Sequence, residues 1–162
     1  MRRRATSVLV VALLSLMSVA CGEEEPDLSV PDREEGQVVL DEVGLLDEAV
    51  ADALTSVDGY DVVAVVYETS QANAGEAHRA GGLVLDAWDA DIALVAVAVP
   101  GDFESTEEDR RRFAGIRPDD PRAVPGSVID AINDEILPVY ASDNDWHGAF
   151  VSSAELLAEE LE

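Results

Sequence analysis

Two apolar segments constrain the fold of this 162-residue chain more than any other feature. They are residues 61–67, DVVAVVY, and residues 92–99, IALVAVAV. Neither shows the alternation of a strand with one wet face, and a continuous β-branched and apolar run is typical of a strand covered on both faces. Such strands occur mainly in parallel sheets that have helices on either side. The pair therefore predicts a buried sheet at the centre of the domain.

Four segments with apolar residues at helical spacing surround these strands. They cover residues 45–56, 72–88, 125–140 and 146–161. Gly81-Gly82 are expected to weaken the second of these helices, and residues 112–116 are expected to form a third strand. The alternation of strands and helices predicts an α/β fold, a three-layer α/β/α sandwich with a small, mostly parallel sheet of three to four strands. In such sheets, ligands bind at loops beyond the carboxyl ends of the strands.

The N-terminal segment has the pattern of an export signal. Arginines at positions 2–4 precede an apolar run over residues 7–20, with small residues just before Cys21. This run is shorter than the roughly 20 residues that a membrane-spanning helix needs, so residues 1–20 are predicted to be a signal peptide. The pattern resembles a bacterial lipoprotein signal, which implies a lipid on Cys21, the only cysteine, and anchoring to the outer face of the cell membrane. The alternative is an ordinary signal peptide cut near Ala20.

Residues 21–36 are predicted to be the lipidated cysteine and an acidic, disordered tether, because they contain two prolines and little to bury. Residues 37–162 are predicted to fold as one domain. The chain has 35 acidic residues, no lysine and a formal net charge of −25. Such a surface repels nucleic-acid phosphates, and no glycine fingerprint for a nucleotide follows a strand. We therefore expect no nucleic acid and no nucleotide as partner; base composition or salt adaptation are alternative origins of the acidity.

The order of several segments resembles the TPM domain family, which includes a thylakoid photosystem II repair factor and bacterial envelope proteins. The matching segments are VVLDEVGLLDEAVADAL with Asp41, DVVAVVY, LVLDAW ending at Trp88, IALVAVAV, and VIDAINDEILPVYASDNDWHGAF with Pro138, Trp146 and Gly148. The resemblance covers about residues 37–161. It implies an α/β domain, and activities of the family include metal-assisted phosphatase action and calcium binding. The chain departs from the family pattern in the loop IRPDDPRAVP, residues 116–125.

Three aspartates are candidates for a calcium site. Asp102 follows the second apolar strand, and Asp119 and Asp120 follow the third predicted strand. Calcium prefers several carboxylate and carbonyl oxygens in one flexible pocket, which loops at neighbouring strand ends can supply. Arg117 and Arg122 flank the acids and are the local candidates for the positive clamp of a metal-assisted phosphatase. The alternative is that all three are solvated surface acids.

A second acidic motif, DNDWHG at residues 143–148, fits the first half of a calcium-binding loop. His147 and Ala154 stand where that loop needs oxygen ligands, so Asp143 and Asp145 are predicted to cap the last helix instead. The two histidines have no cysteine or second histidine beside them, which argues against a transition-metal site.

Two functions from different classes fit the sequence. The first is a lipid-anchored extracytoplasmic domain that acts as a binding or assembly module in the cell envelope, with an envelope protein as partner. The second is a calcium-dependent phosphatase of low specificity that uses Asp102, Asp119 and Asp120 as metal ligands. The basic cluster Arg110–Arg112 is expected to offset the acids before it, with a partner contact as the alternative. The lack of a convincing catalytic set favours the binding module.

Overall fold

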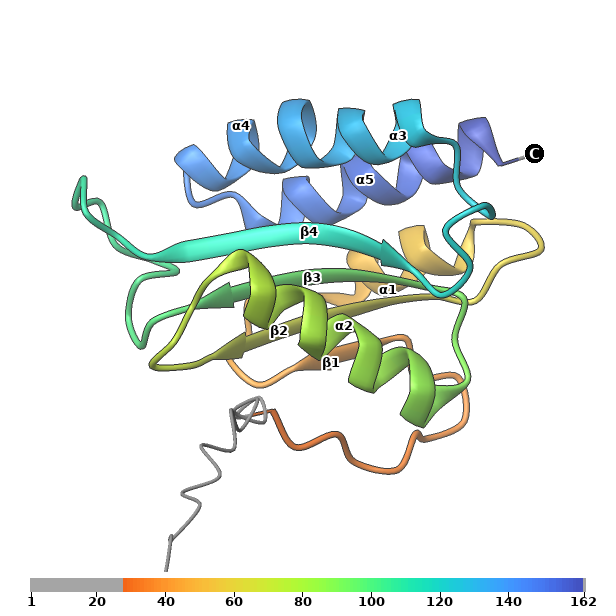
Figure 1. Ribbon diagram of the computed structural model, residues 1–162, viewed down its shortest axis with the longest axis horizontal. Helices are drawn as coiled ribbons and strands as arrows, with labels where there is room; N and C mark the ends of the chain where they lie inside the picture. The colour runs from red at the N-terminus through yellow and green to blue at the C-terminus, as the bar shows by residue number, and fades with distance from the viewer. Residues whose placement is uncertain (1–27, 162) are drawn as a thin grey trace, which may run out of the picture.

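The computed structural model describes residues 28–161, so the predicted signal peptide, Cys21 and the first part of the tether lie outside the described residues. A four-stranded sheet with the order β1-β2-β3-β4 forms the centre of the fold (Figure 1). The strands are β1 (Val39–Asp41), β2 (Val62–Glu68), β3 (Ile92–Ala98) and β4 (Arg112–Pro118). The first three are parallel, and β4 runs antiparallel to β3. This confirms the predicted α/β class and the mostly parallel sheet.

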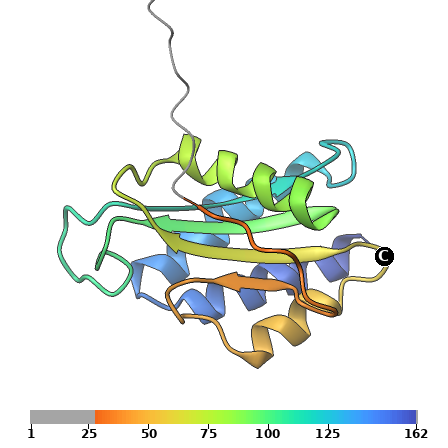
Figure 2. The same ribbon diagram turned by 90° about the horizontal axis from the view of Figure 1, so that it is seen from below.

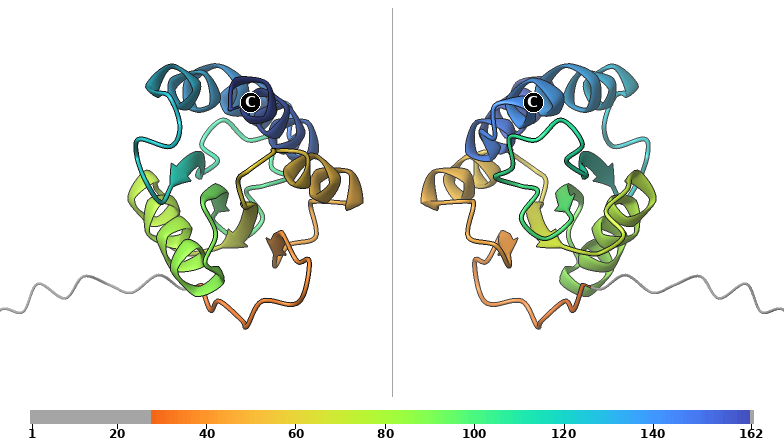
Figure 3. Two further views of the ribbon diagram at one scale, coloured as in Figure 1. Left: turned by 90° about the vertical axis from the view of Figure 1, so that its right-hand side faces the viewer. Right: turned by 90° about the vertical axis from the view of Figure 1, so that its left-hand side faces the viewer.

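Helices cover both faces of the sheet, as the end-on views of Figure 3 show. One face carries α2 (Ala74–Trp88). The other carries α1 (Glu48–Thr55), α3 (Gly126–Asp130), the π-helical segment η1 (Ala131–Ile136), α4 (Leu137–Ser142) and α5 (Trp146–Glu160). The two-sided burial of β2 and β3 explains the three layers, because alternate strand residues pack into two separate cores. None of the helices within residues 28–161 is long and apolar enough to cross a membrane.

Residues 28–36, here called the strap, run along the α2 face of the sheet (Figure 2). Leu28 is buried in the core under α2, and the Trp88 indole donates to the Pro31 carbonyl over 2.9 Å. The Arg33 guanidinium forms an ion pair with the Asp61 carboxylate and lies 5.5 Å from the centre of the Trp88 ring. The prediction that the disordered tether extends through residue 36 is therefore wrong for its second half. The composition of residues 28–36 does not predict this ordered segment, because a few specific contacts hold the strap in place and it contains no run of apolar residues.

A single helical run from α3 through η1 to α4 replaces the regular helix predicted over residues 125–140. Pro138, in the first turn of α4, lacks the N–H that the Asp134 carbonyl would accept in a regular α-helix. The π-helical segment directly before it absorbs this interruption, and such segments recur at functional sites. Asn133 belongs to this segment and reaches β4.

Candidate binding groove along the outer edge of strand β4

The predicted meeting of Asp102, Asp119 and Asp120 does not occur. Because β4 runs antiparallel to β3, the end of β4 lies beside the start of β3. The Asp119 N–H donates to the Asp91 carbonyl over 2.8 Å there, whereas Asp102 lies beyond the opposite end of β3. A strand of seven residues separates the two places, roughly 20 Å at about 3.3 Å per residue. No group of three or more His, Cys, Asp or Glu side chains within residues 28–161 is arranged to hold a metal ion.

Asp102 and Asp120 instead form hydrogen bonds with arginines of the loops in which they lie. Asp102 Oδ2 accepts the Arg111 N–H over 2.7 Å. The carboxylate of Asp120 forms an ion pair with the Arg122 guanidinium over 3.0 Å and also accepts the Arg122 backbone N–H over 2.9 Å. The guanidinium, followed by the backbone N–H, lowers the pKa of Asp120. Arg122, predicted as a phosphate clamp, is therefore engaged with the acid beside it.

Two other acidic residues of the sequence analysis also organise the backbone. The Asp41 carboxylate accepts three backbone N–H groups in the loop before α1 at distances of 2.7 to 2.9 Å. The Asp145 side chain accepts the Gly148 N–H over 2.8 Å at the start of α5, which confirms the cap predicted for Asp145. The cap predicted for Asp143 is wrong, because Asp143 lies at the end of α4 instead. The Asp41 and Asp145 carboxylates thus serve as hydrogen-bond acceptors for the backbone, which gives each a structural role that involves no bound ion.

A groove runs along the outer edge of β4, the edge opposite to β3. Three hollows of about 240, 200 and 440 Å³ follow one another along it. The first and second share Ala114 and Asn133, and the second and third share Arg112, Pro138 and Ala141. The hollows therefore form one continuous surface between β4 and the η1–α4 segment.

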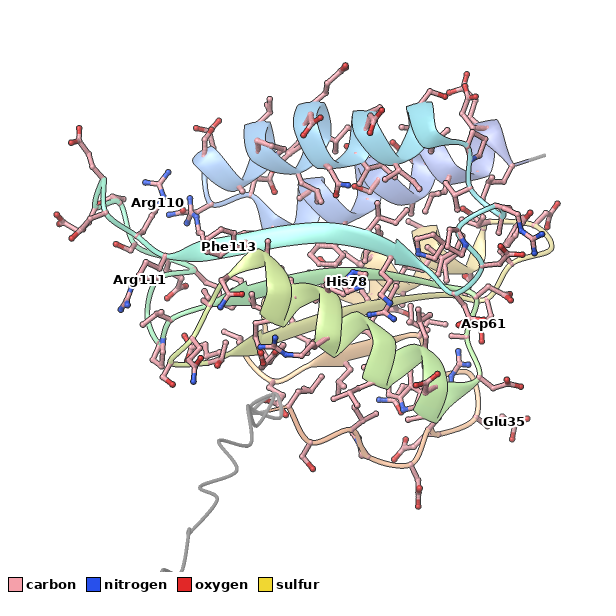
Figure 4. The ribbon with its side chains drawn as sticks, viewed as in Figure 1. Glu35, Asp61, His78, Arg110, Arg111 and Phe113 are labelled. Carbon is pink, nitrogen blue, oxygen red and sulfur yellow. The ribbon has the colours of Figure 1, made fainter. Side chains whose placement is uncertain are left out.

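The end of the groove beside α2 combines polar groups with open space. Gly115 lines it without a side chain, and Asn133 Oδ1 accepts the Ile116 N–H over 3.2 Å. His78 lines the same hollow from α2 (Figure 4). Burial, and to a smaller extent the positive charge of Arg117, lowers the pKa of His78. A neutral imidazole, an amide and a guanidinium thus converge on one small hollow.

The Arg117 side chain explains the paired glycines of α2. Its guanidinium donates to the His78 carbonyl and lies so close to Gly82 that a Cβ there would be 2.6 Å from Arg117 Nη1. A Cβ on Gly81 would be 3.1 Å from Val95 Cγ2. The two glycines therefore let α2 approach β3 and β4 closely. Their effect on helix propensity alone does not reveal this role, which depends on contacts with β3 and β4.

Arg112 holds the middle of the groove together. Its guanidinium donates to the carbonyl groups of Phe103 and Ala141 and to the side chain of Asn144, and it lies 5.4 Å from the centre of the Trp146 ring. Burial, together with the positive charge of the neighbouring arginine at position 110, lowers the pKa of Arg112. The side chain joins β4 to α4, α5 and the loop before β4.

The far end of the groove carries Arg110 and Phe113. Arg110 Nη2 donates to the Ser142 carbonyl over 3.1 Å, and Figure 4 shows Arg110 and Arg111 pointing to opposite sides of the chain. Phe113 lines the second hollow and has 40% of its surface exposed. Aromatic side chains are enriched in protein interfaces, so Phe113 offers this end of the groove an apolar contact.

No strand pairs with the outer edge of β4 within residues 28–161. The antiparallel register points the backbone groups of Arg112, Ala114 and Ile116 away from β3. Asn133 satisfies the Ile116 N–H, and Pro118 has none to offer. The edge is therefore protected at its end and open at Arg112 and Ala114.

These features define a three-layer α/β domain with one open, groove-lined sheet edge. No protein-family model matches the chain, and no curated protein does. Among solved structures, the N-terminal domain of the cg2496 protein from Corynebacterium glutamicum, determined by solution NMR, is similar with a TM-score of 0.54 and 14% identity. The match covers 83% of this chain and 86% of that domain. At this identity the likeness concerns the fold alone.

Proposed function

We propose that this protein is a lipid-anchored, TPM-like domain of the cell envelope that binds a partner protein through the groove along β4. The observation that carries the proposal is the continuity of the three hollows along an unpaired strand edge. Such an edge offers backbone hydrogen bonds to an added strand, and neighbouring hollows accept its side chains. The exposed ring of Phe113 adds an apolar contact of the kind that anchors protein interfaces.

The N-terminal sequence supports the anchoring part of the proposal. The basic, apolar and small-residue pattern before Cys21 has the order of a lipoprotein signal. Residues 22–27 alone separate Cys21 from the strap, so a lipid on Cys21 would hold Leu28 within about 25 Å of the anchor even with that segment fully extended. A tether that extended through residue 36 would allow about twice this distance between the anchor and the domain. A domain held so close acts at the membrane surface.

The phosphatase alternative has no comparable support. Its proposed ligands, Asp102 on one side and Asp119 and Asp120 on the other, lie at opposite ends of β3. The nearby Arg122 pairs with Asp120. Nothing in this arrangement brings a cation, a phosphate clamp and a nucleophile to one point, as phosphoryl transfer requires.

A photo-crosslinking amino acid placed at two matched positions tests the proposal. Phe113 lines the groove and Leu83 lies on α2, and their exposed fractions are 40% and 39%. The full chain carrying p-benzoylphenylalanine at either position would be irradiated in the envelope of cells that produce it. We expect a discrete protein adduct from position 113 and none from position 83. Equal adducts from both positions, or none from position 113, would contradict a binding function of the groove.

A further inference from the structure

The arginines of residues 28–161 fall into two groups. Those that form an ion pair with a carboxylate are Arg33, Arg79 and Arg122. Those that form no such pair with any carboxylate of the described residues are Arg110, Arg111, Arg112 and Arg117. The second group belongs entirely to β4 and the two positions before it. In a chain with a formal net charge of −25, the positive charge that no ion pair neutralises is thus gathered along one strand.

Most of this positive charge lines the groove. Arg110, Arg112 and Arg117 line the three hollows, and among residues 28–161 Glu108 is the only acidic residue that does so. The Arg112 donors are occupied by neutral carbonyl and amide oxygens, which orient the guanidinium without cancelling its charge. Arg110 and Arg117 stand at the two ends, and each donates to backbone carbonyls. Three arginines and one glutamate therefore line the groove of a chain whose formal net charge is −25.

We infer that the groove accepts an extended segment of the partner protein that carries carboxylate side chains. The inference rests on the proposed function and adds the chemistry of the partner. An extended segment fits because the groove follows a strand of seven residues whose edge is open at Arg112 and Ala114. Carboxylates fit because a guanidinium binds them with paired, charge-assisted hydrogen bonds.

The net charge of the protein does not exclude such a partner. Repulsion between solvent-exposed charges is screened over about 8 Å at physiological ionic strength, so the contact is governed by the groups within the groove. The same repulsion disfavours a long run of acids. The structure therefore favours a segment with a few carboxylates, placed to reach Arg110 at one end and Arg117 at the other.

Three peptides as long as β4, seven residues, provide the probe. All alternate valine and threonine, are blocked at both ends, and carry aspartate, asparagine or lysine at their terminal positions. Their binding to the full chain in neutral detergent would be measured by calorimetry. We expect the aspartate peptide to bind about tenfold more tightly than the asparagine peptide and the lysine peptide to bind most weakly. Hydrogen exchange at the Arg112 and Ala114 amides should slow when the aspartate peptide is bound.

Matched variants locate the effect. Arg110→Gln should weaken the aspartate peptide about fivefold and leave the asparagine peptide unchanged. Arg122→Gln removes the same charge at a site that lines none of the hollows and should change neither affinity. Because Arg110 is half-buried and belongs to neither hydrophobic core, this variant is expected to fold.

The outcomes separate this inference from the proposed function. Equal binding of the aspartate and asparagine peptides, preference for the lysine peptide, or no binding of any peptide would overturn the inference. A position-specific adduct from residue 113 would still support a binding groove in each of these cases. Binding of the chain to phosphatidylglycerol vesicles that is lost in Arg110→Gln, with no peptide bound, would assign the arginines to the membrane and also overturn the inference.

Discussion

The pKa of the His78 side chain depends on its surroundings in the groove. His78 is an exposed residue of α2 that lines the hollow beside Gly115 and Asn133 and has Arg117 as its charged neighbour. Burial and the positive guanidinium both disfavour the imidazolium form, so they lower the pKa of His78 below its ordinary value of 6.5. The imidazole is therefore mainly neutral at physiological pH and can accept or donate a hydrogen bond.

The substitution Arg117→Gln should raise the pKa of His78 part of the way toward 6.5, because the charge is removed while the larger effect, burial, remains. An NMR titration of the imidazole ring protons measures the change. Since the folded state binds this proton less readily than the unfolded state, the free energy of unfolding should fall as the pH drops below about 6.5. Below about pH 6.5, the free energy of unfolding should fall less in Arg117→Gln than in the wild type. An unchanged pKa would show that Arg117 does not act on His78.

At the scale of elements, close approach between α2 and the sheet sets the shape of one end of the groove. The helix has Gly81 against Val95 of β3, and Gly82 under the guanidinium of Arg117 from β4. These two contacts differ in kind. A branched side chain within the core has little room to move, whereas the end of an arginine side chain at the surface does.

Alanine at the two glycines should therefore have different effects. Each substitution gains about 1 kcal/mol of helix propensity. In Gly81→Ala, the added methyl meets Val95 and the inner part of Arg117, and we expect a net loss of about 1 kcal/mol in the free energy of unfolding. In Gly82→Ala, the guanidinium can swing away, so stability should be equal or higher while the hydrogen bond to His78 is lost. Chemical denaturation and the His78 titration measure the two effects, and equal losses in both variants would contradict this view.

A small number of contacts also holds the strap against the rest of the domain. Arg33→Gln removes the ion pair with Asp61 and the stacking on Trp88, and it should lower the free energy of unfolding by about 1 kcal/mol. Hydrogen exchange at the Gln37 amide, which bonds the Glu34 carbonyl, should become faster. The exposed Glu35 on the same segment offers a control, because Glu35→Gln should leave both quantities unchanged (Figure 4). Unchanged exchange in Arg33→Gln would mean that other contacts hold the strap.

At the scale of the whole molecule, acidic residues far outnumber arginines, and the arginines of residues 28–161 that form no ion pair are gathered in and just before β4. Self-repulsion among many carboxylates destabilises the folded state, and salt screens it. The antiparallel direction of β4 keeps Asp102 away from Asp119 and Asp120, so no cluster of these three concentrates the charge. The molecule should respond to cations as a charged surface.

Raising sodium chloride from about 0.05 M to 0.5 M should therefore raise the melting temperature. Calcium and magnesium at equal, millimolar concentrations should raise it by similar amounts, and Asp119→Asn/Asp120→Asn should respond as the wild type does. Differential scanning calorimetry measures both. A gain specific to calcium and lost in the double variant would indicate a specific site at these residues.

The proposed anchoring of the whole molecule would depend on Cys21, which lies outside the described residues. Cys21→Ala should shift the protein from the membrane fraction to the soluble fraction, because it removes the thiol that would carry the lipid. Arg33→Gln, which affects only the strap, should leave the protein in the membrane fraction. Quantitative fractionation of cells that produce each variant provides the measurement. Retention of Cys21→Ala in the membrane would refute a lipid at that position.

Local patterns were enough to predict the class of fold. The apolar runs in β2 and β3 predict strands buried on both faces, and Asp145 predicts the start of α5, because burial and capping act within a few residues. The direction of β4 was not predictable in this way. The apolar pattern of a strand does not depend on the direction in which it pairs, and the loop before β4 is long enough for more than one connection.

The sequence by itself determined that this chain forms a layered α/β domain, since hydrophobic periodicity depends only on neighbouring residues. The tertiary structure alone decided where the charges meet. It separated Asp102 from Asp119, paired Arg33 with Asp61, and gathered the unpaired arginines beside helix residues far away in the sequence. Electrostatic and packing interactions act over a few ångströms in space, and the distance along the chain between two side chains does not reveal that distance.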